Sequence, residues 1–126
     1  MLMTFSSYRD LLVWQKSIDL VEVVYALTAR FPSSERYGLS SQARRAAVSI
    51  AANIAEGRGR GTQREFLRYL LIANGSVKEL ETEAIIAQRL GLLAADEAKV
   101  ILVAAEEIGR MLAGLRRKLL ARVSPG

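Results

Sequence analysis

The sequence predicts an all-α fold, an antiparallel up-down-up-down four-helix bundle formed by a single domain over residues 1–126. Apolar residues recur at alternating steps of three and four along four long segments, as one face of a helix requires. Short connections separate these segments, which makes consecutive helices antiparallel neighbours. With 126 residues, of which 51% are hydrophobic, the chain is long enough to bury one core.

The first helix is predicted over about residues 8–30, and two apolar rows run along it. One row consists of Leu11, Trp14, Ile18, Val21 and Tyr25. The other row, Val13, Leu20, Val24, Leu27 and Phe31, lies beside it. One bundle needs a single apolar seam, so we expect the first row to face the core. The second row is then spare, and it places Val13, Leu20, Val24 and Leu27 at an oligomer interface.

The second helix is predicted over about residues 40–57, after the turn-forming segment "FPSSERYG". Ser40 is the expected N-cap, and Gly57 is expected just beyond the last helical residue. Apolar positions at helical spacing include many alanines, which let a neighbouring backbone approach closely. Asn53 is a poor interior helix residue, so it bonds across an interface, caps a neighbouring loop or simply faces water. We include it among the oligomer-interface residues.

The third and fourth helices are predicted over about residues 62–90 and 96–121. Thr62 and Glu65 fit a capping box at the start of the third helix. Its core row continues past Gly75, which we interpret as a packing glycine rather than a ligand contact. Asp96 and Glu97 place negative charge where a helix start favours it. The expected core rows are Phe66, Leu70, Ala73, Val77, Leu80, Ala84 and Ala87, then Ile101, Ala105, Ile108, Leu112, Leu115 and Leu119.

The composition excludes most enzyme chemistry. The chain contains neither cysteine nor histidine, which removes thiol nucleophiles, imidazole bases and the common transition-metal ligands. We therefore expect no catalytic residue, no metal site and no cofactor. The least implausible enzyme is a metal-dependent nuclease using Glu79 and Glu83. No segment reads as a signal peptide or a membrane span, so we expect a cytoplasmic protein without membrane contact.

The net charge of +5 and the pI near 10.0 favour polyanionic partners. The segment "NIAEGRGRG" follows a helix rather than a strand, so its glycines form a turn and not a dinucleotide-binding loop. Arginines 58, 60, 64 and 68 gather at the start of the third helix, where cations oppose the helix dipole. Either these arginines follow a phosphate backbone, or they pair with Glu56 and Glu65 on an ordinary surface turn.

Two further basic groups are less distinctive. Arg44 and Arg45 either join an interface network or extend the basic surface. The cluster of Arg116, Arg117, Lys118 and Arg122 ends the fourth helix, where the dipole favours positive charge. We interpret that cluster as a solvated tail, with a binding role as the alternative.

The segments "LLVWQKSIDLVEVVY", "FPSSERYGLSSQARRAAVSIAANIAEG" and "FLRYLLIANGSVKELETE" carry a resemblance to a known family. Over about residues 8–93 the sequence resembles the four-helix-bundle proteins encoded in intervening sequences of bacterial 23S ribosomal RNA genes. That resemblance implies a homopentameric ring, and it does not imply an enzyme. Related proteins are accessory factors of diversity-generating retroelements, in which a basic pentamer binds nucleic acid and a reverse transcriptase.

The sequence departs from a base-reading protein in one respect. Only Phe66 and Tyr69 are aromatic residues near the glycine-rich turn, so we expect contact with phosphates rather than stacking on bases. The favoured function is oligomeric, non-enzymatic, sequence-tolerant binding of RNA or DNA through Arg44, Arg45, Arg58, Arg60, Arg64 and Arg68. The alternative is an interaction scaffold for a partner protein, with arginines that only keep the chain soluble.

Overall fold

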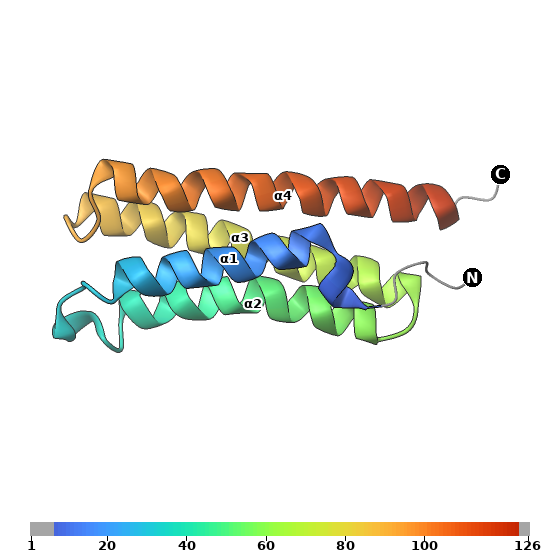
Figure 1. Ribbon diagram of the computed structural model, residues 1–126, viewed down its shortest axis with the longest axis horizontal. Helices are drawn as coiled ribbons and strands as arrows, with labels where there is room; N and C mark the ends of the chain where they lie inside the picture. The colour runs from blue at the N-terminus through green and yellow to red at the C-terminus, as the bar shows by residue number, and fades with distance from the viewer. Residues whose placement is uncertain (1–6, 124–126) are drawn as a thin grey trace.

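The computed structural model describes residues 7–123, which form four long helices and two short 3₁₀ helices (Figure 1). The long helices are α1 (Leu12–Thr28), α2 (Leu39–Gly59), α3 (Gln63–Arg89) and α4 (Ala95–Val123). The helix η1 (Tyr8–Asp10) precedes α1, and η2 (Ser33–Glu35) precedes α2. The predicted all-α four-helix bundle is confirmed, while the predicted domain limits at residues 1 and 126 lie outside the described residues.

Figure 1 shows consecutive helices running in opposite directions. Each helix packs against the next one along the chain, and α1 also packs against α4. The start of α1, the end of α2, the start of α3 and the end of α4 therefore share one end of the bundle. We call this the α2–α3 end, and we call the opposite end, where η2 lies, the α1–α2 end. Within residues 7–123, the helices are too short or too polar to cross a membrane.

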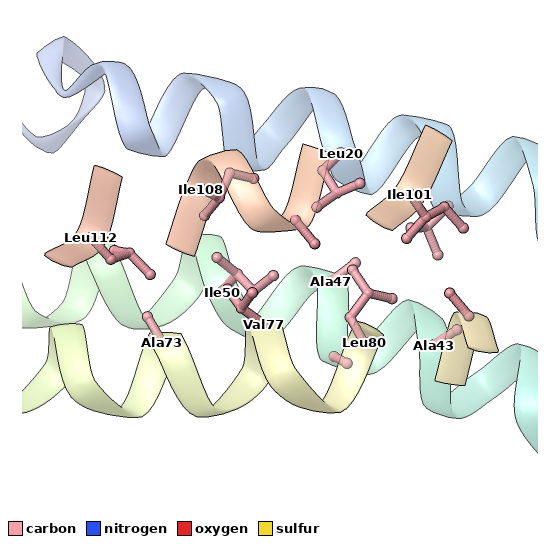
Figure 2. Packing of buried hydrophobic residues seen from close by; sticks show 14 of the residues in the cluster. Leu20, Ala43, Ala47, Ile50, Ala73, Val77, Leu80, Ile101, Ile108 and Leu112 are labelled. Atoms are coloured by element: carbon pink, nitrogen blue, oxygen red, sulfur yellow. The ribbon is translucent and has the colours of Figure 1, made fainter. Parts of the chain in front are cut away.

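The core lies between all four helices. In Figure 2, Leu20 of α1, Ile50 of α2, Val77 of α3 and Ile108 of α4 point into one interior. Every residue of the core row predicted for α3 is buried, and the row predicted for α4 is buried except for Leu115, which is half-buried. Periodicity therefore identified the inward faces of both helices correctly.

The assignment of the two rows of α1 is wrong. Val13, Leu20 and Val24 are only 4%, 1% and 0% exposed, because they pack into the core of their own bundle. Side chains covered in this way have no surface to offer a second copy, so these three are not interface residues. Leu27 is half-buried and packs against the core. The half-exposed face belongs instead to the row of Trp14, Ile18, Val21 and Tyr25, of which only Tyr25 is exposed.

Two buried hydroxyls explain the error. The inward face of α1 includes Ser17 and Thr28, which a count of apolar residues treats as outward positions. Ser17 donates to the Val13 carbonyl and Thr28 to the Val24 carbonyl, both at 2.7 Å. Each hydroxyl thus bonds one turn back along its own helix, which removes most of the cost of burying it.

The predicted end of the second helix at Gly57 is also wrong. The helix α2 continues to Gly59, so Gly57 is a helical residue and not the residue that ends the helix. It is buried, and a Cβ atom built on it would lie 2.5 Å from the Cβ of Tyr69 in α3. The reversal falls at Gly61, whose φ of +87° suits glycine. Thr62 then caps α3 as predicted, since its hydroxyl accepts a hydrogen bond from the Glu65 amide at 3.2 Å.

The structure also tests the interpretations of Gly75 and of Glu97. Gly75 is exposed, and no atom lies within 4 Å of a Cβ built on it, so it is not a packing glycine within the described bundle. Glu97 acts at the start of α4, where the Ala94 amide donates to its carboxylate at 2.8 Å. That hydrogen bond, together with the one from Arg30, lowers the pKa of Glu97.

The close approach at Gly57 leads to a prediction for two glycine substitutions. Gly57→Ala should lower the free energy of unfolding by about 1–3 kcal/mol, because the new methyl group overlaps Tyr69. Gly109→Ala is the matched control, since Gly109 is also helical and its built Cβ lies at an ordinary 3.6 Å from its nearest neighbour. That control should stabilise the protein by about 0.5–1 kcal/mol. Urea denaturation measures both, and changes of the same sign would contradict the packing described here.

Candidate nucleic-acid interface

The α2–α3 end gathers half of the chain's 18 arginines and lysines but only three of its 13 carboxylates. The carboxylates are Asp10, Glu56 and Glu65. The topology causes this asymmetry, because three basic segments far apart in sequence meet at one end of the bundle (Figure 1). We call these nine cations the basic end: Arg9, Arg58, Arg60, Arg64, Arg68, Arg116, Arg117, Lys118 and Arg122.

A hydrogen bond links the two largest parts of the basic end. The side chain of Gln63, at the start of α3, donates to the backbone carbonyl of Leu119 in α4. Gln63 precedes Arg64, and Leu119 follows Lys118, so the cluster at the end of α4 lies beside the glycine-rich turn. Sequence reasoning treated that cluster as a separate tail. The predicted up-down order of the helices was the signal that could have joined the two groups.

Arg60 belongs to a network around Tyr69. Its guanidinium lies 5.2 Å from the centre of the Tyr69 ring. It donates to the Tyr69 hydroxyl at 2.6 Å and to the Glu56 carboxylate at 3.1 Å, and the hydroxyl donates to Glu56 at 3.0 Å. The hydrogen bond to Tyr69 is the main cause that raises the pKa of Arg60. The network holds Arg60 in place at the end of α2.

The other arginines of the turn differ in their surroundings. Arg68 lies 3.9 Å from the Glu65 carboxylate, and its guanidinium is 5.2 Å from the Tyr69 ring centre. Arg64 is exposed and makes no ion pair within residues 7–123, whereas Arg58 is half-buried. The expected pairing with Glu56 and Glu65 is therefore present. Exposed pairs of this kind contribute about 0–1 kcal/mol, so a phosphate can replace the carboxylate at little cost.

Fewer arginines oppose a helix dipole than the sequence suggested. Arg58 lies in the last turn of α2 and Arg60 is its C-cap residue, where the dipole favours positive charge. Arg68 lies beyond the first turn of α3. Only Arg64 opposes the dipole at a helix start. The basic end therefore favours a polyanion through the number of cations it gathers, and not because these cations lie where a helix dipole disfavours them.

Arg44 and Arg45 do not lie at the basic end. Arg44 points toward the end of α1, where its Nε donates to the Thr28 hydroxyl at 2.9 Å and its Nη2 to the Tyr25 carbonyl at 3.4 Å. Arg45 is exposed on the same helix, α2. Both residues belong to the α1–α2 end, so the six arginines selected from the sequence form two separate surfaces.

Asn53 bonds mainly within its own helix. Its amide donates to the Ser49 carbonyl at 2.8 Å and to the Ser49 hydroxyl at 2.9 Å. Ser49 in turn shares a 2.8 Å hydrogen bond with Ser76 of α3. The asparagine is half-buried, and its predicted place at an oligomer interface stays a prediction.

Glu79 and Glu83, the candidate nuclease pair, lie in different surroundings. Glu79 is exposed, whereas Glu83 is 5% exposed and its Oε1 has no hydrogen-bond partner within the described part of the chain. Burial, and to a smaller extent the negative charge of Glu79, together raise the pKa of Glu83 to about 7. A carboxyl group held partly protonated near neutral pH is a poor metal ligand. Residues 7–123 contain no group of three acidic side chains that could hold a metal ion.

A groove of about 520 Å³ runs between α1 and α4, with Leu20 and Ile108 among its lining residues. Lys16 and Glu107 form an ion pair beside it at 2.7 Å. Their mutual hydrogen bond raises the pKa of Lys16 and lowers that of Glu107. The groove has both acidic and basic side chains along its edges, so it does not extend the basic end.

The fold and the charge distribution define a small all-α protein, a four-helix bundle with one basic end. The family model described as "23S rRNA-intervening sequence protein" matches residues 9–114, and the chain belongs to this family. It is also similar to the crystal structure of a protein with unknown function from the S23 ribosomal protein family of Bacteroides thetaiotaomicron VPI-5482. The TM-score is 0.75 at 22% identity, over 83% of this chain and 98% of that one, which shows a shared fold. A search of curated proteins gives no match.

Proposed function

We propose that this protein is a non-enzymatic, oligomeric binder of RNA or DNA that holds phosphates at its basic end. The observation that carries the proposal is the meeting of nine cations with only three carboxylates at that end. Phosphate contacts by arginine and lysine release counterions from the nucleic acid, and this supplies most of the affinity of sequence-tolerant binding. The cytoplasmic location expected from the sequence accompanies this proposal.

Contact with phosphates fits the basic end better than base stacking does. Tyr69 is the aromatic side chain that lies between the arginines of the basic end, and only 8% of its surface is exposed. The guanidinium groups of Arg60 and Arg68 already pack against its ring. An unpaired base would have to displace both arginines to reach the ring. We therefore propose that this end does not select a base sequence.

The oligomer is part of the proposal. The outer face of α3 exposes Leu71, Ile72, Ile85 and Ile86, four large apolar side chains on one helix. They form two apolar pairs about 20 Å apart along the helix, and exposed apolar side chains of this size favour contact with another protein surface. The family resemblance implies a homopentamer, and five copies would together carry a charge of about +25, five times the +5 of one chain. Many weak phosphate contacts then act together.

The test is a charge reversal on α3 with a duplex RNA as the probe. Binding by the parent protein should weaken as salt rises, with a slope of about −0.9 in log affinity against log salt for each phosphate neutralised. Arg64→Glu with Arg68→Glu should lower the affinity at least about tenfold and flatten that slope by about 2. Fluorescence anisotropy across a salt series measures both quantities.

The matched control reverses two exposed cations of α4 outside the basic end, Lys99→Glu with Arg110→Glu, for the same change in net charge. It should keep most of the affinity, and light scattering should give the same mass for every variant. Equal losses in the two double variants, or binding that ignores salt, would overturn the proposal. Capture of one protein by the parent chain after nuclease treatment would then favour the interaction scaffold.

A further inference from the structure

A second pocket, of about 320 Å³, lies at the α1–α2 end of the bundle, far from the basic end. Three kinds of side chain line it, namely arginine, tyrosine and serine, and no carboxylate does. The lining residues are Tyr25, Arg36, Tyr37, Ser40, Ser41, Arg44 and Arg45. We call this group the tyrosine–arginine pocket. It brings together residues from α1, from the connection after η2 and from the first turns of α2.

Arg44 is held in position by uncharged groups. Its guanidinium lies 4.4 Å from the centre of the Tyr25 ring and donates to the Thr28 hydroxyl and the Tyr25 carbonyl. None of these partners carries a negative charge, so the positive charge of Arg44 stays available to an anion. A guanidinium that is already oriented loses less conformational freedom when it binds.

Tyr37, unlike Arg44, is not held against the bundle. It is 89% exposed, in the turn before α2, and the Arg36 guanidinium lies 5.7 Å from its ring centre. Burial in the bundle therefore does not explain this aromatic side chain. Its ring offers a flat, open surface beside three cations. Glu35, the acidic residue next to this turn, instead accepts a hydrogen bond from the Leu39 amide at 3.1 Å.

We propose that the tyrosine–arginine pocket binds a nucleotide whose base is unpaired. The phosphate would lie against Arg44 and Arg45, and the base would stack on the Tyr37 ring. Proteins recognise unpaired nucleotides with this combination of guanidinium groups and open aromatic rings. The sequence analysis considered aromatic residues only beside the glycine-rich turn, whereas here Tyr25 reaches Arg44 from a neighbouring helix. The inference stands apart from the proposed function, which needs only phosphates at the other end.

The experiment compares a short single-stranded oligonucleotide, a blunt duplex of the same length and uridine monophosphate as probes of the full chain. Tyr37→Ala should weaken single-strand binding about tenfold, since stacking of one base on an aromatic ring is worth about that factor. Tyr37→Phe keeps the ring and should retain the parent affinity. Binding of the duplex should not change in either variant. Because Tyr37 is exposed, neither substitution threatens the fold.

Two further arms separate the alternatives. Arg45→Gln should weaken single-strand binding, while Arg110→Gln, an exposed arginine on α4, serves as its control. Displacement of the oligonucleotide by uridine monophosphate would identify a free nucleotide as a ligand, and binding of the oligonucleotide alone would identify a strand. Both results support the pocket. Equal competition by inorganic phosphate, or equal affinities of Tyr37→Ala and the parent, would overturn it.

The same Tyr37→Ala substitution in the Arg64→Glu and Arg68→Glu background distinguishes the two proposals. If the basic end fails as a duplex site, single-strand binding at the pocket should still depend on Tyr37. If the pocket fails, duplex binding should still depend on Arg64 and Arg68. Each proposal therefore has its own variant and its own probe.

Discussion

Raising the pH from 5 to 8 should lower the free energy of unfolding of this protein by roughly 2–3 kcal/mol, because the buried Glu83 carboxyl must ionise. Its pKa of about 7 in the folded chain lies above the ordinary value of 4.5. The folded state therefore holds this proton more tightly than the unfolded state does. The resulting stability is fully present below about pH 4.5 and is lost as the pH rises through about 7.

The composition of the chain makes this transition easy to observe. Histidine and cysteine are absent, so the side chains that ordinarily titrate between pH 5 and 8 do not contribute. Glu97 and Glu107 have lowered pKa values, and their contributions are lost only at more acidic pH. For a chain of this size the melting temperature should fall by roughly 10 °C across the range. Circular dichroism melts at pH 5, 6, 7 and 8 measure it.

Glu83→Gln provides the decisive variant. Glutamine has nearly the shape of the protonated carboxyl and does not ionise, so the variant should match the parent near pH 5 and exceed its melting temperature at pH 8. Glu79→Gln is the control, since Glu79 is exposed and acts on Glu83 only through its charge. It should reduce the pH dependence slightly. A parent protein whose stability does not change with pH would contradict the burial of Glu83.

Leu20→Ala should lower the free energy of unfolding by about 2–5 kcal/mol, as expected when a core leucine is truncated. Leu20 is 1% exposed and points toward Ile108 in the interior seen in Figure 2. Ile18→Ala is the matched control two residues earlier on α1. Ile18 is half-buried on the other row, so its truncation should cost less, about 1 kcal/mol. Urea denaturation gives both values.

This pair of variants decides between the two rows of α1. A larger loss for Ile18→Ala than for Leu20→Ala would restore the assignment made from the sequence alone. Light scattering on the same samples separates a change in folding from a change in assembly. If Ile18 takes part in self-association, its variant should change in mass and lose no more than about 1 kcal/mol of stability.

The fold could be predicted because an unbroken apolar row runs along almost the whole length of α3 and of α4. In α3 and α4 the spacing of three and four leaves a single inward face, and the described core follows it. In α1 two rows competed, and the choice depended on Ser17 and Thr28, whose hydrogen bonds to the preceding turn are invisible in a count of apolar residues. The end of α2 was misplaced at Gly57 because glycine serves a helix end and a close helix contact equally well.

The candidate site could be predicted only in part. The arginines around the glycine-rich turn were recognised from their spacing. That they lie beside the cluster at the end of α4 depends on the antiparallel directions of the helices. Arg44 was selected for its charge, whereas its position depends on Tyr25 and Thr28 of another helix. Tyr37 had no sequence signal beyond its place in a turn, since its exposure is a property of the folded chain.

The unequal distribution of charge between the two ends of the bundle also affects how the molecule approaches a charged partner. Outside the basic end, ten carboxylates outnumber nine cations, so all of the net positive charge comes from one extremity of an elongated body. Within about a Debye length, roughly 10 Å at 0.1 M salt, a polyanion exerts a torque that turns this extremity forward. Most collisions at low salt would then begin in the productive orientation. Added salt should slow capture before it shortens the lifetime of a complex already formed.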